Sequence, residues 1–243
     1  MVIQNIMSSY LVCIPTYNEA ENIDSILDRV LALNIPDLAV LVIDDKSPDG
    51  TAAIVERRSD SRIHLLKREK KEGLGPAYLA AFAWGMNSGF DYFIEMDADG
   101  SHQPEELPAL LAASDHSDLV LGTRWMPGGS VHNWPIYRKA ISRIGTRYAQ
   151  FALKMPYRDL TGGFRVISRN LLETVDIPQI ETLGYGFQIE MAMRTFDAGL
   201  SISEVPITFI ERVRGASKMN NQIVFEALVK TTQWGFQRRL NRR

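Results

Sequence analysis

The sequence contains little cysteine and no long apolar run, and each absence excludes a class of protein. Cys13 is the single cysteine among 243 residues, so no disulfide can form within the chain, which is typical of a reducing compartment. No segment reaches the roughly 20 consecutive apolar residues that a membrane-spanning helix needs. Residues 1–10 lack the charged and apolar regions of a secretory signal. We therefore expect a cytoplasmic protein that does not cross a membrane by itself.

An excess of charge of one sign is also missing. The formal net charge is −2, and we expect no nucleic-acid partner, because such proteins usually carry a clear basic excess. Residues 204–243 are the exception, since eight Lys or Arg stand against three Glu there. Two interpretations of this tail stay open: a solvated helix end, or a surface attracted to an anionic membrane or a phosphate-bearing ligand.

Several common catalytic motifs are absent. The glycine pair of EGLGPAY lacks the third glycine of a dinucleotide fingerprint, because Tyr78 stands in its place. There is no P-loop lysine pattern, and the four histidines show neither metal-ligand spacing nor a hydrolytic triad. A Rossmann oxidoreductase and a serine hydrolase are therefore both disfavoured.

Short apolar runs alternate with helical patterns in the first half of the chain. Strands are expected at 10–14, 39–44, 63–66, 92–97 and 118–123, and helices at 19–33, 51–58, 74–87 and 104–113. In the second half we expect a helix over 137–153, a turn at DLTGGFRV, a helix around 187–199, a strand over 203–212 and a helix over 222–239. This succession predicts an α/β fold with a mostly parallel central sheet and helices on both faces.

Polar segments follow each of the first five predicted strands. They are PTYNE, DDKSPDG, KREKKEGLG, DADGSH and TRWMPGG. Because the carboxyl ends of parallel strands share one edge of a sheet, these segments predict a ligand site there.

The segment DADGS carries the sharpest chemical signal. Asp97 ends a predicted strand and Asp99 follows it, and paired carboxylates at this position suit a hard cation such as Mg²⁺ or Mn²⁺. A helix cap explains one of the two aspartates but not both. Asp45 also follows a strand, and its carboxylate can accept hydrogen bonds from a base or a ribose. Arginines such as Arg124 and Arg138 suit phosphate oxygens, so together these residues fit a diphosphate substrate.

Six ordered motifs carry a resemblance to a known family. They are IPTYNEAENI, VIDDKSPDGT, EMDADGSHQPE, DLTGGFRV, GYGFQIEM and RVRGASKM, and they extend from about Tyr10 to Met219. The sequence resembles the inverting family-2 glycosyltransferases, and within them the polyprenyl (dolichyl) phosphate mannose synthases. The resemblance implies a GT-A catalytic domain over residues 1–218, and residues 219–243 are expected to form an amphipathic basic helix on a membrane surface.

The resemblance also implies a role for each matching residue. For the donor, GDP-mannose, the residues are Pro15, Tyr17, Glu19, Ile43, Asp45, Asp97, Ala98, Asp99, Arg212 and Lys218. For Mg²⁺ or Mn²⁺ they are Asp97 and Asp99, with Ser101 where some relatives carry a ligating Gln. Arg124 and Arg138 would bind the acceptor phosphate and complete a catalytic set with the two aspartates. Gln188 and Glu190 would orient the sugar or acceptor, although Glu190 fits equally a buried partner of an arginine.

The implied reaction moves mannose from GDP-mannose to a polyprenyl phosphate with inversion, giving a β-mannosyl phosphate and GDP. Another donor such as UDP-glucose, or a non-catalytic nucleotide-sugar-binding subunit, stays open. A nucleotidyltransferase is disfavoured, because PTYNEAEN is acidic where that class needs a basic loop. The lipid acceptor implies peripheral contact with an anionic membrane on the cytoplasmic face, and whether a membrane partner subunit takes part stays open.

Overall fold

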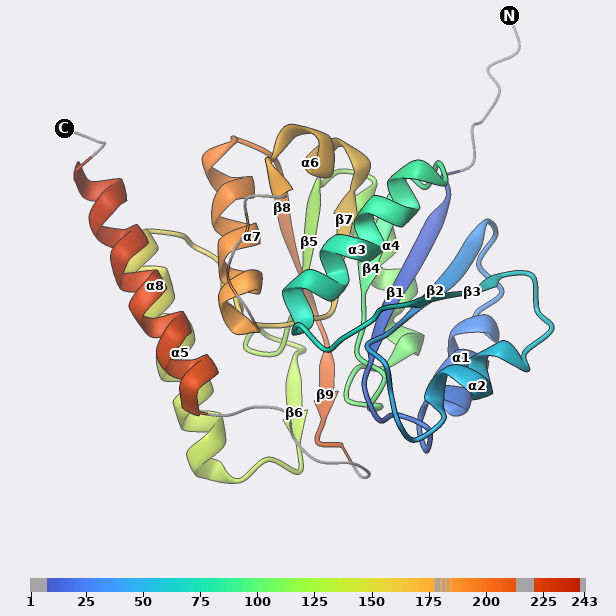
Figure 1. The fold of residues 1–243 in the computed structure, drawn as a ribbon. Coiled ribbons are helices and arrows are strands. Elements are labelled where there is room, and N and C mark those ends of the chain that lie inside the picture. Colours follow the sequence, from blue (N-terminus) through green and yellow to red (C-terminus); the bar gives the residue numbers. More distant parts are fainter. Residues whose placement is uncertain (1–7, 178–179, 181, 183, 213–220, 241–243) are drawn as a thin grey trace, which may run out of the picture.

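The computed structural model describes all residues except 1–7, 178–179, 181, 183, 213–220 and 241–243 (Figure 1). The first half contains β1 (Tyr10–Thr16), α1 (Ile23–Leu31), β2 (Leu38–Asp44), α2 (Thr51–Glu56), β3 (Ile63–Lys67), α3 (Leu74–Asn87), β4 (Tyr92–Glu95), a 3₁₀ turn (Pro104–Glu106), α4 (Leu107–Ser114) and β5 (Leu119–Thr123). The second half contains β6 (Ser130–His132), α5 (Ile136–Leu153), β7 (Arg165–Ser168), α6 (Arg169–Thr174), α7 (Tyr185–Asp197), β8 (Ile202–Pro206), β9 (Thr208–Ile210) and α8 (Asn221–Leu240).

The central sheet has the strand order β3-β2-β1-β4-β7-β5-β8. Only β7 is antiparallel to its neighbours, and it lies between β4 and β5. The strands β1 to β5 therefore all end at the same edge of the sheet. This arrangement brings the five polar segments of the sequence to one edge, as predicted.

Helices cover both faces of the sheet, which confirms the predicted layers (Figure 1). On β1, Leu11 and Cys13 pack into the core beneath α3 and α7. Val12 and Ile14 point to the opposite face, into the core beneath α1 and α4. The alternation follows from the two-residue repeat of a strand, and a strand covered on both faces reads as a continuous apolar run.

Three short strands differ from the sequence predictions. β7 begins inside the segment DLTGGFRV, which was predicted as a turn. The strand predicted over 203–212 is divided at Ile207, whose N–H donates to the Thr123 carbonyl and whose carbonyl accepts from Ser130 N–H. Beyond Ile207 the chain leaves the central sheet, and β9 pairs with β6 in a small second sheet. Residue alternation alone cannot show such a change of partner.

The last helix is packed onto the body of the protein at one end of the molecule (Figure 1). α8 contacts α5 and α7, and Ala227 on α8 is buried. Gly235 allows a close approach to α5, because a Cβ there would lie 2.8 Å from the Ala152 carbonyl oxygen. The division between residues 1–218 and 219–243 stays a prediction. In the described parts of the chain, no helix is both long and apolar enough for a bilayer span.

Candidate active site

The two aspartates lie in the loop of residues 96–103 between β4 and the 3₁₀ turn, which we call the aspartate loop. Asp99 is buried, and its Oδ1 accepts a hydrogen bond from the Ser101 N–H at 3.0 Å. Its Oδ2 lies 2.7 Å from Arg212 Nη2. Asp97 is more exposed, with 35% of its side-chain surface accessible. Burial by itself raises the pKa of Asp99, but the contacts with Ser101 and Arg212 outweigh it and leave the pKa below its usual value. Asp99 is therefore ionised at neutral pH.

His102 supports this loop from beneath and was not predicted as a site residue. Its Nδ1 accepts a hydrogen bond from the Asp97 N–H at 3.1 Å. The ring is buried and stacks on Phe164, with 5.2 Å between the ring centroids. In a neutral imidazole the proton then resides on Nε2, which lies 3.9 Å from Asp97 Oδ2. His102 thus fixes the backbone from which Asp97 projects.

The donor set of the loop fits a hard divalent cation with few protein ligands. Within the described residues, no three His, Cys, Asp or Glu side chains come together as a metal cage. Asp97 and Asp99 supply carboxylate oxygens, and a cation held by two carboxylates takes its other ligands from water and phosphate. Ser101 is buried beside them and holds Asp99 through its backbone.

The predicted nucleoside residues lie at the ends of β1 and β2. Pro15 and Ile43 are opposite one another in the parallel pairing of these strands. The Lys71 ammonium lies 4.0 Å from the centre of the Tyr17 ring. Glu19 is buried, and its carboxylate accepts a hydrogen bond from the Asn22 side chain at 2.9 Å. These residues therefore form one end of the polar edge.

Asp45 is paired with Arg68, which was not predicted individually. Arg68 Nη1 lies 2.9 Å from Asp45 Oδ1, and both side chains are largely buried. Burial raises the pKa of Asp45 above its usual value, although the Arg68 charge opposes the rise. The sequence offered one signal, because Arg68 lies in the polar segment that follows β3. Arg68 Nη2 also lies 2.6 Å from Glu72 Oε2, so the guanidinium joins two carboxylates at this edge of the sheet.

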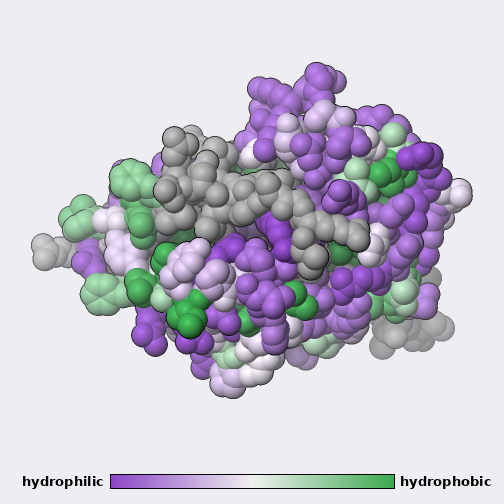
Figure 2. All heavy atoms as spheres, turned by 90° about the horizontal axis from the view of Figure 1, so that it is seen from below, coloured by the Kyte–Doolittle hydropathy of each residue, from purple (hydrophilic) through white to green (hydrophobic). Residues whose placement is uncertain are grey.

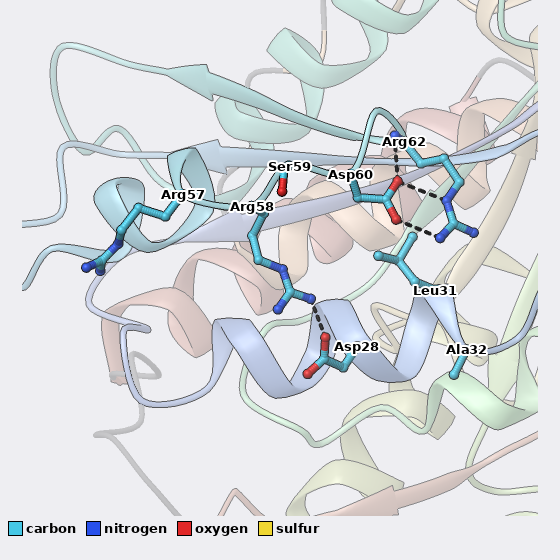
Figure 3. Close-up of a pocket in the computed structure, with 8 residues that line it drawn as sticks. All are labelled: Asp28, Leu31, Ala32, Arg57, Arg58, Ser59, Asp60 and Arg62. Carbon is cyan, nitrogen blue, oxygen red and sulfur yellow. Dashed lines mark hydrogen bonds and ion pairs between the residues drawn. The ribbon is translucent and has the colours of Figure 1, made fainter.

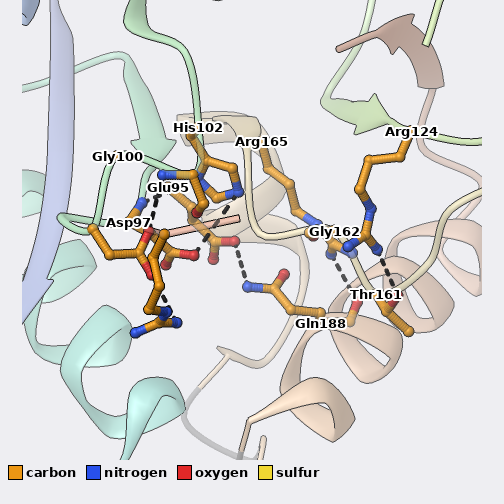
Figure 4. A network of polar contacts seen from close by, with 12 residues as sticks. Glu95, Asp97, Gly100, His102, Arg124, Thr161, Gly162, Arg165 and Gln188 are labelled. Atoms are coloured by element: carbon orange, nitrogen blue, oxygen red, sulfur yellow. Dashed lines mark hydrogen bonds and ion pairs between the residues drawn. The ribbon is translucent and has the colours of Figure 1, made fainter. Parts of the chain in front are cut away.

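The two predicted acceptor arginines are held in different ways. Arg124 is buried and forms a two-pronged contact with Asp159, at 2.7 Å from Nε to Oδ2 and 2.8 Å from Nη2 to Oδ1. Arg124 also donates to the Thr161 hydroxyl at 3.0 Å (Figure 4). Arg138 stacks over the Trp134 ring at 4.2 Å and forms an ion pair with Glu211. Asp159, Thr161 and Trp134 were not predicted.

Gln188 and Glu190 are both directed into the protein. Gln188 Nε2 donates to Glu95 Oε2 at 2.7 Å, and both residues are buried (Figure 4). Glu190 accepts hydrogen bonds from Thr182 Oγ1 at 2.7 Å and from Arg194 Nη2 at 2.6 Å. For Glu190 the structure shows the alternative named from the sequence, a buried partner of an arginine. The orienting role of these two residues stays a prediction.

A buried polar network connects the aspartate loop to α7 (Figure 4). Arg165 is buried and donates to the carbonyls of Leu160, Gly162 and Gln188 at 2.7–2.8 Å. Burial lowers its pKa to about 10. Burial raises the pKa of Glu95 to about 7, even though Arg165 and Gln188 favour the charged form. The network was not foreseen, because its partners are distant in the sequence.

An apolar cavity of about 110 Å³ adjoins the two arginines, between α5 and α8. Its lining includes Arg124, Trp134, Arg138, Ile141, Ile189 and Leu228. Charged groups therefore border a space whose remaining lining is mostly apolar, with the hydroxyl-bearing residues Ser142, Tyr148, Thr161 and Thr231 among it. Such a cavity suits a ligand with a phosphate head and a hydrocarbon chain.

A second depression lies between the end of α1 and the connection from α2 to β3 (Figure 3). It is lined by charged pairs, including Arg62 with Asp60 at 2.7 Å and Arg58 with Asp28. None of the predicted site residues lines it. The predicted residue Lys218 lies outside the described residues.

Comparison with known proteins identifies the family. The model of glycosyl transferase family 2 matches residues 11–176. The chain belongs to glycosyltransferase family 2. It is 49% identical to an undecaprenyl-phosphate mannosyltransferase of Micrococcus luteus over 227 residues, which cover 93% of each chain. It is 45% identical to a polyprenol monophosphomannose synthase of Mycolicibacterium smegmatis, over 96% of this chain and 89% of the relative.

The solved structures extend the likeness to the fold. Glucosyl-3-phosphoglycerate synthase of Mycobacterium tuberculosis, in complex with Mn²⁺, UDP and glucosyl-3-phosphoglycerate, superimposes with a TM-score of 0.70 at 20% identity. The match covers 94% of this family-2 chain and 80% of that structure. The predicted GT-A fold is thereby confirmed.

Proposed function

We propose that this protein transfers mannose from GDP-mannose to a polyprenyl phosphate, with inversion at the sugar and with a divalent cation. One observation carries the proposal: two consecutive residues join a pair of carboxylates suited to a metal to the arginines that border an apolar cavity. Glu211 forms an ion pair with Arg138, and the next residue, Arg212, forms one with Asp99. The proposed metal site and the proposed acceptor site are therefore connected through two consecutive residues. The names of the two relatives, which both refer to mannosyl transfer or to a polyprenol phosphomannose, support the same substrates.

The pair of Asp45 and Arg68 favours a guanine base over uracil. Guanine presents two adjacent N–H donors that a carboxylate accepts, beside oxygen and nitrogen acceptors that suit a guanidinium, whereas uracil presents one N–H between two carbonyl oxygens. The two side chains are 2.9 Å apart, so one base edge can meet both. UDP-glucose remains the alternative donor that the test must include.

Asp97 and Asp99 would hold Mg²⁺ or Mn²⁺. When bound, the cation neutralises charge on the departing diphosphate. Arg212, which already lies in the site beside Asp99, supplies a further positive charge to the diphosphate. The acceptor phosphate is itself an anion, so its oxygen can attack the sugar without a strong general base.

The acceptor phosphate would lie at Arg124 and Arg138, with the start of the lipid chain in the cavity between α5 and α8. The acceptor oxygen forms a bond to C1 of mannose while the bond from C1 to the diphosphate breaks, and GDP leaves. Asp159 and Trp134 hold the two arginines in place, so little reorganisation is needed when the phosphate arrives. Direct displacement gives the β-linked product.

A membrane contact by α5 and α8 accounts for access to the lipid. Exposed apolar residues lie on both helices: Ile136, Tyr137, Ile141, Ile144 and Phe151 on α5, and Phe225, Leu228, Val229, Phe236 and Leu240 on α8. α5 also carries Arg138, Lys139, Arg143 and Arg147 and no acidic residue. Figure 2 shows apolar side chains gathered at the end of the molecule where α5 and α8 lie. Apolar and basic residues together suit the anionic, cytoplasmic face of a membrane.

The test is transfer by the purified protein. Labelled GDP-mannose, Mn²⁺ or Mg²⁺ and a polyprenyl phosphate are mixed, and label is measured in the organic phase. We expect transfer that a chelator abolishes. Transfer only from UDP-glucose would overturn the donor. Absence of transfer from either donor, with nucleotide binding retained, would favour the non-catalytic binding subunit.

A further inference from the structure

Two consecutive residues after β9 each form an ion pair with one part of the proposed site. Glu211 pairs with Arg138, one of the two arginines at the acceptor cavity. Arg212 pairs with Asp99 of the aspartate loop, at 2.7 Å. Successive side chains of an extended segment point to opposite sides, so one dipeptide can reach both parts.

The backbone of the same segment is fixed to both neighbouring loops. The Ile210 N–H donates to the carbonyl of Ser101, which follows Asp99 in the aspartate loop, at 3.1 Å. The Glu211 N–H donates to the carbonyl of His132, which precedes Trp134 and Arg138, at 3.1 Å. Residues 210–212 are therefore joined through their backbone to both parts of the proposed site.

The two ion pairs occupy positions that the ligands need. Arg212 places a positive charge on the carboxylate that a cation would use, and Glu211 places a negative charge on the arginine that a phosphate would use. The side chains of Arg138 and Glu211 are 19% and 23% exposed, and that of Asp99 is 5% exposed. Partly buried charges of this kind are costly to leave without a partner, so each pair persists until a ligand replaces it.

We infer that Glu211 and Arg212 act as internal counter-ions that hold the metal site and the acceptor-phosphate site in the unliganded protein, and that their exchange for ligands couples the two sites. The inference rests on the proposed function for the identity of the ligands. A cation at Asp99 displaces Arg212, which then pairs with the donor diphosphate. A phosphate at Arg138 displaces Glu211, the adjacent residue.

Two consequences follow from this exchange. Without a nucleotide, Mn²⁺ competes with Arg212 and binds weakly, whereas GDP supplies Arg212 with a new partner and strengthens Mn²⁺ binding. Because Glu211 is adjacent to Arg212, displacement of Arg212 by Mn²⁺ with GDP also weakens the pair of Glu211 with Arg138 and so strengthens binding of the acceptor phosphate. By reciprocity, the acceptor phosphate strengthens binding of Mn²⁺ with GDP. The order of loading is thus set by charge exchange within the chain.

The first test measures Mn²⁺ binding without any nucleotide, from the electron paramagnetic resonance signal of free Mn²⁺. Arg212→Gln should bind Mn²⁺ about 5-fold more tightly than the wild type, and Arg212→Lys should stay near the wild type. Arg62→Gln is the matched control, since Arg62 pairs with Asp60 away from the site. Unchanged or weaker Mn²⁺ binding by Arg212→Gln would overturn the inference. Failure of GDP to bind would contradict the proposed donor and leave this comparison valid.

The second test uses farnesyl phosphate as a soluble acceptor probe in calorimetric titrations. Glu211→Gln should bind it more tightly than the wild type, and Glu56→Gln, which removes a pair with Lys67, is the matched control. In the wild type, Mn²⁺ with GDP should lower the dissociation constant of the probe by about 5-fold or more. Glu211→Gln and Arg212→Gln should each reduce this effect, and Glu56→Gln should keep it. Equal affinity for the probe with and without Mn²⁺ and GDP would rule out the coupling.

Discussion

The first half of the chain and the helix pair of α5 and α8 differ in how far their apolar side chains are exposed. In the sheet and its covering helices, apolar side chains are buried on both faces. Among the described residues, every large apolar side chain that is exposed belongs to α5 or α8. A concentrated exposed apolar surface of this kind marks an interaction site, and the partner proposed for it is a membrane. The comparison separates a nucleotide half, which is proposed to bind the donor, from a helix pair that is proposed to face a lipid.

The largest effect should come from the aspartate loop, which belongs to the nucleotide half. Asp99→Asn removes a charge from the proposed metal site, and we expect transfer to fall at least 100-fold while the circular dichroism spectrum is unchanged. Asp60→Asn, in an exposed pair with Arg62, is the control and should keep full activity. Normal turnover by Asp99→Asn would show that transfer does not need a metal at this carboxylate, and would contradict the proposed site.

The helix pair can be tested without touching the chemistry. The double substitution Ile144→Glu with Phe151→Glu places charges on two exposed residues of α5. We expect binding to phosphatidylglycerol vesicles to fall by about 100-fold or more, because the double substitution removes two apolar side chains that contribute about 1.5–3 kcal/mol each when buried. Flotation measures the binding. Ala83→Glu on α3 adds the same kind of charge elsewhere and should change little, and undiminished flotation of the double variant would contradict a lipid-facing pair.

A smaller effect is expected at the base. Arg68→Lys keeps the charge but loses the planar fork beside Asp45, and we expect about 10-fold weaker GDP binding by calorimetry. The loss should be smaller for UDP, which would reduce the preference between the bases. Arg29→Lys, paired with Glu105, is the control. An unaltered ratio of GDP affinity to UDP affinity in Arg68→Lys would show that Arg68 does not select the base.

The smallest effect concerns the pH dependence of the free energy of unfolding, which we attribute to Glu95 in the nucleotide half. Burial raises the pKa of Glu95 to about 7, so the folded state keeps a proton that the unfolded state has already lost. The free energy of unfolding should therefore fall by about 1 kcal/mol between pH 6 and pH 7, which lowers Tm by roughly 2–4 °C. Glu95→Gln still accepts from Gln188 and should lose this slope. Calorimetric melts measure this pH dependence, and an equal dependence in the wild type and Glu95→Gln would show that another group causes it. Glu105→Gln, at an exposed carboxylate, serves as the control.

The comparison also explains what could be predicted from the sequence. The strands of the nucleotide half are continuous apolar runs followed by polar segments, so the sheet, its edge and the aspartates were predictable. β7 was not, because its Arg165 is an arginine in a buried strand that three backbone carbonyls satisfy. β6 and β9 have only three residues each, which is too short for a period to be seen.

Supporting residues were missed for a related reason. Arg68, Asp159 and Glu95 contact site residues that are 23, 35 and 93 positions away in the sequence. No local pattern links such partners. The sequence predicted a helix over 137–153, but the exposure of its apolar face depends on where α8 packs, which is a tertiary fact.

The most direct test of the account is the chemical balance of the reaction. The purified protein is incubated with Mn²⁺, labelled GDP-mannose and polyprenyl phosphate, and lipid-linked mannose, free mannose and GDP are each quantified, with the anomeric configuration of the lipid product determined by NMR. We predict one lipid-linked β-mannosyl phosphate for each GDP released and little free mannose. Release of free mannose without a lipid product, or an α-linked product, would contradict direct displacement by a lipid phosphate at this site.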